Sequence, residues 1–490
     1  MQISVAELRT PELEFGDNKA YFTDPRLGLA SAGPFSLRFG RAHKAQIRLG
    51  LVGPRNLLSD ARHWYRRCER EVLTGKPGVP MYVDFPGFER AFQSVVVLNQ
   101  AWEVDVANRL DAALQQSGHR RFDAVLDTYA AAIRKLSREQ SVDVITCCLP
   151  PEVITNCWSV TRTLTRIERN QLARARKEEE GGQLSFDALW APDDTPEELL
   201  QRDFRRALKA RAMESNTPIQ IVTSGLLYDD QANQDAATRA WNSSVALFYK
   251  AGGIPWRVRP QGPETCFVGI SFHYLRTTKA DLMYSSVAQA FSSEGDGFAL
   301  KGESVPRSSE TQRSAYLDSA QAANLAHKVL TEYRERTGRD PARIVLHKTT
   351  RFTTEERAGF SSVFGNIPIL EFINIEPSDF RLVQRSAYPP KRGTLCRINE
   401  DATYIFTTGY IPEWNTYPGM HIPVPLKIVT DRETDILRAA SDVLALARMN
   451  WNTAFDTTGA PITLRFARQV GGIMAEVGLR EPSPSYRFYM

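Results

Sequence analysis

The chain has 490 residues, of which 42% are hydrophobic and 24% charged, and its net charge is +4. This composition is that of an ordinary globular protein with two to three domains. There is no run of about 18 apolar residues, so we expect no membrane span. The N-terminal "MQISVAELRTPELEFGD" lacks the basic-then-apolar pattern of a secretory signal. The six cysteines lie mostly in apolar runs without metal-ligand spacing, which predicts reduced, buried thiols in a cytoplasmic protein.

The first half of the chain alternates predicted strands and helices. Residues 1–45 hold short polar-apolar alternations broken by Gly and Pro, which predicts a short β-rich extension. From residue 46 to 250, strands such as "AQIRLGLVG", "SVDVITCCLP" and "PIQIV" alternate with helices of some length. This order predicts an α/β domain with a parallel sheet. Within it, residues 165–200 are highly charged and are interpreted as an insertion.

Residues 251–490 form a second predicted unit, also α/β. It opens with the strand "TCFVGISFHY", followed by a Gly/Ser-rich hairpin over 292–310, a helix, and the strand "ARIVLHKTT". Further β segments around "GTLCRINEDATYIFTTG" lead to two closing helices and the apolar tail "SYRFYM". No internal repeat is visible.

One helix, predicted over 198–215, is clearly basic. Arg205 and Lys209 are four residues apart and share a face of this helix. Gln220 opens the next strand, and Lys250 ends the following helix. A guanidinium, two ammonium groups and an amide donor are suited to a terminal phosphate. Spacing alone leaves open the alternative of a solvated basic face.

A family resemblance decides between these alternatives. Lys209, Gln220, Asn242 and Lys250, followed by Gly252, Gly253, Pro255 and Trp256, resemble the MID domain of Argonaute proteins running into their PIWI domain. The segments "FVGISF", "RIVLHKTTRF", "GTLCRINEDATYIFTTGYIPEWNTYPGMHIPVPLKI" and "NWNTAFDTTGAPITLRFARQVG" resemble PIWI, and the resemblance covers roughly 45–490. It implies a Rossmann-like MID domain over 46–250 and an RNase H-like PIWI domain over 251–490. Arg205 stands where the family has an aromatic residue that stacks on the first guide base.

The resemblance also implies that the PIWI domain does not cut. Ser271, Thr349 and Arg468 stand where active members carry metal-binding side chains. Hard cations need anionic oxygen ligands, so three such replacements predict an inactive centre. His347 is interpreted as a packed strand-end imidazole. The alternative is a nuclease with a rearranged site, built from displaced carboxylates elsewhere in this half: Asp281, Glu303, Glu355 and Asp456.

The chain thus resembles a short prokaryotic Argonaute, a guide-loaded sensor in phage or plasmid defence. The resemblance implies that a 5′-phosphorylated RNA guide is bound by Arg205, Lys209, Gln220, Asn242 and Lys250, with a structural Mg²⁺ held by the C-terminal carboxylate of Met490. Four further cations, Arg351, Lys391, Arg392 and Arg465, are expected to contact the duplex with a single-stranded DNA target. The implied partner is a chain with an APAZ region and an effector, sirtuin-like or TIR, that hydrolyses NAD. A structural subunit without nucleic acid is a further alternative. The sequence does not specify the effector type, the preferred 5′ base or the oligomeric state.

Overall fold

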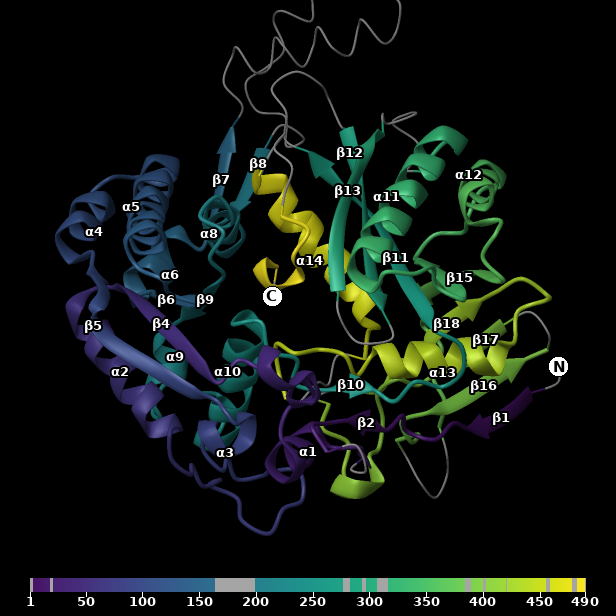
Figure 1. Cartoon of the computed structure of the whole chain (residues 1–490), viewed down its shortest axis with the longest axis horizontal. Helices are drawn as coiled ribbons and strands as arrows, with labels where there is room; N and C mark the ends of the chain where they lie inside the picture. Colours follow the sequence, from purple (N-terminus) through teal and green to yellow (C-terminus); the bar gives the residue numbers. More distant parts are fainter. Residues whose placement is uncertain are drawn as a thin grey trace, which may run out of the picture.

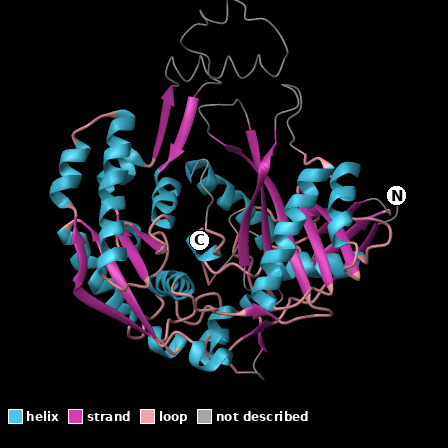
Figure 2. Cartoon of the chain, turned by 45° about the horizontal axis from the view of Figure 1, so that its top comes forward, coloured by secondary structure: helices cyan, strands magenta, loops and turns pink. Residues whose placement is uncertain are grey.

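The computed structural model describes most of the chain. The described residues are 3–17, 21–163, 199–275, 283–292, 297–305, 316–383, 389–399, 402–419, 421–454, 459–477 and 483–489. They form two α/β units side by side, joined by an N-terminal segment that crosses both (Figures 1 and 2). No helix in these ranges is long and apolar enough to cross a membrane.

The first unit is a three-layer α/β sandwich around a parallel sheet. Its strands are β4 (Gln46–Gly53), β5 (Val95–Asp105), β6 (Val144–Cys148) and β9 (Ile219–Val222), in the order β5-β4-β6-β9. Apolar residues of α2 (Arg55–Cys68) and α10 (Ala236–Lys250) pack on one face of the sheet. Those of α4 (Ala107–Leu114), α5 (Gly118–Glu139) and α8 (Phe204–Met213) pack on the other. Three short helices complete the unit: α3 (Phe88–Phe92), α6 (Pro151–Cys157) and α9 (Ser224–Leu227).

The basic helix begins later than the sequence indicates. The helix predicted over 198–215 starts only at Phe204, because residues before it form β8 (Leu199–Asp203), paired antiparallel with β7 (Ser159–Thr163). Asp203 ends that strand and caps the helix, its side chain accepting from the Arg206 backbone N–H. The greater part of the predicted insertion at 165–200 lies outside the described residues.

The second unit is built on a nine-stranded mixed sheet, the largest in the described part. Its order is β1-β16-β17-β18-β15-β14-β11-β12-β13, and β11, β14 and β15 are parallel neighbours at its centre. Its strands are β1 (Ile3–Glu7), β11 (Thr265–Leu275), β12 (Met283–Ser292), β13 (Gly297–Val305), β14 (Arg343–Lys348), β15 (Ile369–Pro377), β16 (Thr394–Ile398), β17 (Ala402–Ile405) and β18 (Leu426–Val429). Helices α11 (Ser319–Thr337) and α12 (Thr354–Phe364) cover one face. Helices α13 (Ile436–Leu446) and α14 (Ile462–Val477) cover the other.

The N-terminal segment is only partly the β extension that its sequence predicts. Strand β1 joins the edge of the large sheet beside β16, and β2 (Leu13–Glu14) pairs with β3 (Tyr21–Phe22) and β10 (Arg257–Val258). Two helical elements follow, α1 (Pro25–Ala32) and the 3₁₀ helix η1 (Phe35–Ala42). Helix α1 begins here because the Asp24 side chain caps it and Pro25 occupies its first turn.

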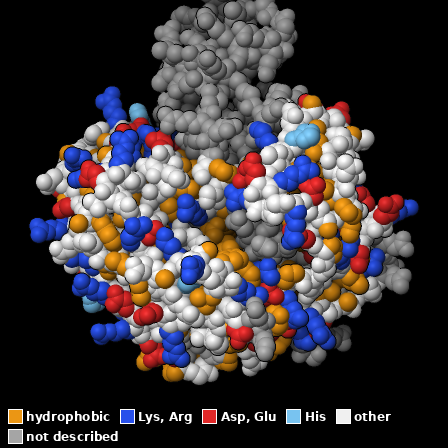
Figure 3. Space-filling model, in the orientation of Figure 1, with side chains coloured by type: hydrophobic (Ala, Val, Ile, Leu, Met, Phe, Trp, Pro, Cys, Tyr) orange, Lys and Arg blue, Asp and Glu red, His pale blue; other side chains and the backbone are white. Residues whose placement is uncertain are grey.

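The two units meet at an aromatic seam. Tyr249 at the end of α10 packs its ring 4.6 Å from that of Trp451, which lies between α13 and α14. Tyr486, in the C-terminal 3₁₀ turn η5 (Tyr486–Phe488), packs against Tyr249 at 5.4 Å and against Phe466 of α14 at 4.6 Å. A second 3₁₀ turn, η4 (Pro412–Trp414), lies in the loop before β18. The space-filling view shows a hollow between the units, with hydrophobic side chains inside it and Lys and Arg around it (Figure 3).

Candidate nucleic-acid-binding site

The sequence-predicted lysines lie together on the first unit. Lys209 of α8 is only 5% exposed, and its Nζ donates to the Tyr489 carbonyl at 3.1 Å. Burial lowers the pKa of Lys209 well below its ordinary value, and the nearby cations Arg205 and Lys250 lower it further. The last described turn of the chain thus lies against a lysine 280 positions earlier.

Lys250 and Gln220 complete the cluster. The Lys250 Nζ lies 3.4 Å from Gln220 Oε1, and the Gln220 amide donates to the Ser243 carbonyl at 3.3 Å. Burial lowers the pKa of Lys250 to about 7, with a further contribution from Arg205. Within the described part of the chain, no carboxylate forms an ion pair with Lys250. A buried lysine without a counterion is costly, and a bound anion removes that cost.

Arg205 lies close to Lys209, Gln220 and Lys250 (the lysine pocket), and Arg487 lies near Gly252, two residues after Lys250. Arg205 lies in the first turn of α8, exposed to solvent, and its charge acts on both lysines. Arg487, in η5, was not predicted from the sequence. Its Nη1 lies 4.0 Å from the position that a Cβ on Gly252 would take, and its Nε is buried with no hydrogen-bond partner in the described residues. Spacing gives no signal for Arg487, because only the fold brings the C-terminal turn to α10.

Asn242, predicted as a phosphate ligand, occupies a different position. Its Oδ1 accepts from the Thr453 hydroxyl and from the Ala454 backbone N–H, both at 2.9 Å. Asn242 precedes Lys250 by eight residues on the same helix, about 12 Å along its axis. Asn242 therefore holds the loop between α13 and α14 against the first unit. Its contribution to the lysine pocket is indirect, because that loop carries Trp451 of the aromatic seam.

In the second unit, two of the three positions predicted to have lost a metal ligand lie side by side where the pairing of β11 with β14 ends. The last parallel pair of β11 and β14 is Ile270 with Lys348, so Ser271 and Thr349 follow side by side. Both lie on the sheet face of His347, whose Nδ1 is 2.9 Å from the Thr463 hydroxyl of α14. The Ser271 hydroxyl is buried and has no partner in the described residues. Arg468 lies on α14, but its side chain is outside the described set.

His347 is packed, as its strand position predicts. It is fully buried, and burial together with Arg343 lowers its pKa to about 3, so the ring is neutral. On the opposite sheet face, Lys348 forms an ion pair with Glu356 of α12 at 2.5 Å, both side chains being 1% exposed. Three aromatic rings, of Tyr316, Phe272 and Phe352, surround the Lys348 ammonium at 4.7–5.5 Å. Glu356 thus neutralises the charge of Lys348 inside the fold.

The donors at Ser271 and Thr349 do not fit a pair of divalent cations. Ser271 and Thr349 offer neutral hydroxyls, whereas hard cations require anionic oxygens. The described residues contain no group of three or more His, Cys, Asp or Glu side chains that could hold a metal. Of the displaced carboxylates, Glu355 is exposed in the first turn of α12. Asp281, Asp456, the Glu303 side chain and Met490 lie outside the described residues.

The four predicted duplex contacts have different environments. Arg351 is exposed just beyond β14, and Lys391 forms a surface ion pair with Glu7 at 3.1 Å. Arg465 is half-buried on α14 near Tyr486. Arg392 is half-buried, and burial lowers its pKa, while the nearby acids Glu413 and Asp24 oppose this shift. Arg392 therefore packs beneath the N-terminal segment, where it is less accessible to a nucleic-acid duplex than Arg351 or Lys391.

The comparisons with known proteins bear on this arrangement. No family model and no curated protein matches the chain. Among solved structures, the Clostridium butyricum Argonaute bound to a guide DNA with a 5′ deoxycytidine and a 19-mer target DNA matches 100% of this chain, with a TM-score of 0.64 and 15% identity. Aa-Ago with externally bound siRNA matches 99%, with a TM-score of 0.60 and 13% identity.

The chain has the MID–PIWI fold of Argonautes. It spans 55% and 56% of the length of these two structures. The predicted fold class is confirmed, with the parallel sheet of the first unit as MID and the nine-stranded sheet as PIWI. The lysine pocket accordingly belongs to the MID unit, and Ser271 and Thr349 to the centre of the PIWI sheet.

Proposed function

We propose that this protein is a guide-loaded Argonaute subunit that recognises a complementary nucleic acid without cutting it. The observation that carries the proposal is the pair of buried lysines on the MID unit, Lys209 and Lys250, which act on each other by charge, with Gln220 bonded to Lys250. Two adjacent ammonium groups with lowered pKa values form a site that a phosphate completes, since its charge opposes theirs. The guide is proposed to be RNA with a 5′ phosphate.

Arg205 and Arg487 extend the proposed role of the pocket. Arg205, exposed at its margin, stacks its planar guanidinium on the first guide base. Arg487 approaches from the C-terminal turn, where its Nε lacks a partner among the described residues. A structural Mg²⁺ beside the phosphate remains part of the proposal, with the carboxylate of Met490 as its ligand. Sequence is then read by base pairing, and the protein contacts backbone.

The absence of cleavage is proposed from the donor chemistry of two adjacent positions in the PIWI sheet. Ser271 and Thr349 supply hydroxyls where a two-metal centre needs carboxylates. Target recognition is then reported to a partner chain, proposed to carry an APAZ region and a sirtuin-like or TIR NAD hydrolase. Single-stranded DNA of phage or plasmid origin is the proposed target, and NAD depletion the outcome. The alternative is a nuclease with rearranged carboxylates. Of the four carboxylates considered for it, Glu355 is the one whose side chain lies among the described residues.

The proposal is tested on nucleic acid that copurifies with the chain and its partner. Extracted material is end-labelled with and without prior phosphatase treatment, and short 5′-phosphorylated RNA is expected. Lys209→Met plus Lys250→Met should abolish it, whereas Lys135→Met, an exposed lysine of α5, should not. A complementary DNA target should remain intact in Mg²⁺ or Mn²⁺. Target cleavage would contradict the non-cleaving assignment, and a complex without nucleic acid would contradict guide loading.

A further inference from the structure

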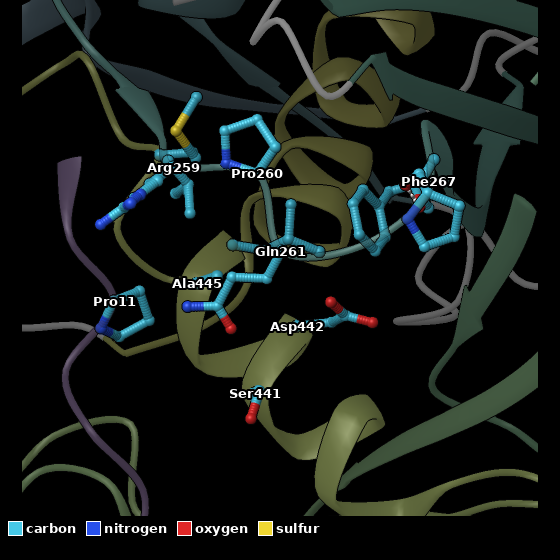
Figure 4. A pocket seen from close by; sticks show the side chains of 13 residues that line it. Pro11, Arg259, Pro260, Gln261, Phe267, Ser441, Asp442 and Ala445 are labelled. Carbon is cyan, nitrogen blue, oxygen red and sulfur yellow. Dashed lines mark hydrogen bonds between the residues drawn. The ribbon is translucent and has the colours of Figure 1, made fainter. Parts of the chain in front are cut away.

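A second pocket lies on the PIWI unit and shares no residue with the lysine pocket. It opens between the N-terminal segment, the linker from β10 to β11, and helix α13 (Figure 4). It encloses about 730 Å³, part of it open to solvent. Its walls are mostly apolar and include Pro11, Val258, Pro263, Phe267, Leu446 and Met449. Phe267 is only half-buried, so part of its ring remains available to a ligand.

A carboxylate forms the polar floor of this pocket. Asp442 of α13 is 15% exposed, and its Oδ2 accepts from Arg343 Nη2 at 2.7 Å. No donor in the described part of the chain bonds to its Oδ1. The carboxylate lies near Gln261 and Phe267 at the pocket (Figure 4). One oxygen of this acid therefore has no donor from the described residues beside a mostly apolar cavity.

Burial, more than the charges around it, disfavours the ionised form of this carboxylate. Arg343 also donates its Nε to Glu371 at 2.8 Å, and Arg438 donates to the same glutamate at 2.6 Å. Burial raises the pKa of Asp442 to about 6; Arg343 and Arg438 oppose this shift, and Glu371 adds to it. At the rim, Arg259 is engaged with Glu12 at 2.7 Å. A guest that brings a positive charge or a strong donor stabilises the ionised acid.

The chemistry of the pocket favours one class of ligand. A carboxylate floor repels phosphate, so the pocket does not lie on the proposed path of the nucleic acid. Apolar walls above an acid accommodate an alkyl stem that ends in a cation. A guanidinium fits better than an ammonium, because its plane packs on an aromatic ring such as Phe267 while its N–H groups reach the carboxylate.

The surface beside the pocket indicates that the guest belongs to a polypeptide. Leu437 of α13 is 50% exposed and lies one turn before Ser441, which lines the pocket. One exposed leucine thus lies beside the pocket on the same helix, and it offers a polypeptide a second apolar contact. We propose that this pocket receives an arginine side chain from a protein partner, with the guanidinium on Asp442 and the stem between Phe267 and Met449. The proposal does not depend on guide binding.

The test uses the methyl group of Met449 as a reporter inside the pocket. The full chain, labelled with ¹³C at methionine methyl groups, is titrated with N-acetyl-arginine N-methylamide, and the Met449 signal is assigned by Met449→Leu. A matched titration uses the citrulline compound, which has nearly the same shape but no charge. Saturable movement of the Met449 signal with arginine, and at least tenfold weaker binding of citrulline, is expected. Equal responses, or none, would overturn the proposal.

Variants separate recognition from folding. Asp442→Asn should weaken the arginine response at least tenfold. Ala445→Phe, which fills the pocket from α13 without touching the charge network, should abolish it; Arg259→Gln at the rim should not. Far-UV circular dichroism establishes that all three variants fold, so that a lost response is a loss of recognition. Tighter binding of free arginine than of the blocked compound would assign the pocket to a small molecule and overturn the role of a protein partner.

Discussion

Raising the pH from 7 to 9 should weaken the binding of a 5′-phosphorylated oligonucleotide by about fiftyfold. Lys250 has a pKa of about 7 in the empty pocket, so at pH 9 it is largely neutral. A bound phosphate dianion returns that pKa toward 10.5, and binding then requires the uptake of a proton. At pH 7 about half of the Lys250 side chains are already neutral, so the two pH units together cost a factor of about fifty, or about 2.3 kcal/mol. Below pH 6 the phosphate itself gains a proton, so affinity should be highest near pH 7.

The assay is fluorescence anisotropy with an RNA labelled at its 3′ end, carrying either a 5′ phosphate or a 5′ hydroxyl. The difference between the binding free energies of these two RNAs cancels any effect of pH on the contacts that both RNAs make. Lys250→Arg, which stays protonated, should reduce the slope of log affinity against pH by about one unit, leaving any contribution from Lys209. If the wild-type profile is flat from pH 7 to 9, or if Lys250→Arg keeps the full slope, the reasoning about this buried lysine is refuted.

Three further predictions concern stability. In the empty protein, Lys250 binds more protons in the unfolded chain than in the folded one between pH 7 and 10.5, so its contribution to the unfolding free energy should rise by about 1.4 kcal/mol per pH unit in this window. The difference between the wild type and Lys250→Met in denaturant titrations measures this contribution, because the buried cysteines, whose pKa is raised, act alike in both. Gly269→Ala should lower the free energy of unfolding by ~3 kcal/mol or more, because a Cβ there would lie 2.2 Å from the Thr463 carbonyl oxygen. Gly75→Ala should leave it unchanged, because a Cβ there would meet nothing within 4 Å. Lys348→Met should cost about 3–5 kcal/mol by leaving Glu356 buried without its cation, and adding Glu356→Gln should recover part of this in thermal melts. Equal losses in the single and double variants would contradict that last account.

The α/β class and the order of elements were predictable because period and length are local properties. Strands such as Val144–Cys148 and Arg343–Lys348 are short buried runs between longer helical segments, and both are found where the sequence places them. The start of the basic helix was misplaced, because the strand Leu199–Asp203 is stabilised by its pairing with Ser159–Thr163 across a long gap in sequence. Pairing of that kind leaves no local pattern.

The candidate site was predictable in part for the same reason. The spacing in sequence places Lys209 on α8, Gln220 on β9 and Lys250 on α10, and these three elements pack together, so the side chains lie close to one another. Asn242 shares that spacing, yet its side chain is taken by the loop at Thr453. Arg487 joins the pocket only through tertiary folding. The apolar tail was the sole hint that the C-terminal segment is buried.

The central claim is that Lys209 and Lys250 hold a 5′ phosphate. It is tested most directly by comparing the affinities of one RNA with a 5′ phosphate and with a 5′ hydroxyl, at pH 7, in the wild type and in Lys209→Met plus Lys250→Met. The account predicts that the wild type prefers the phosphate by at least tenfold and that the double variant binds both ends equally. Equal binding of the two ends by the wild type would contradict it.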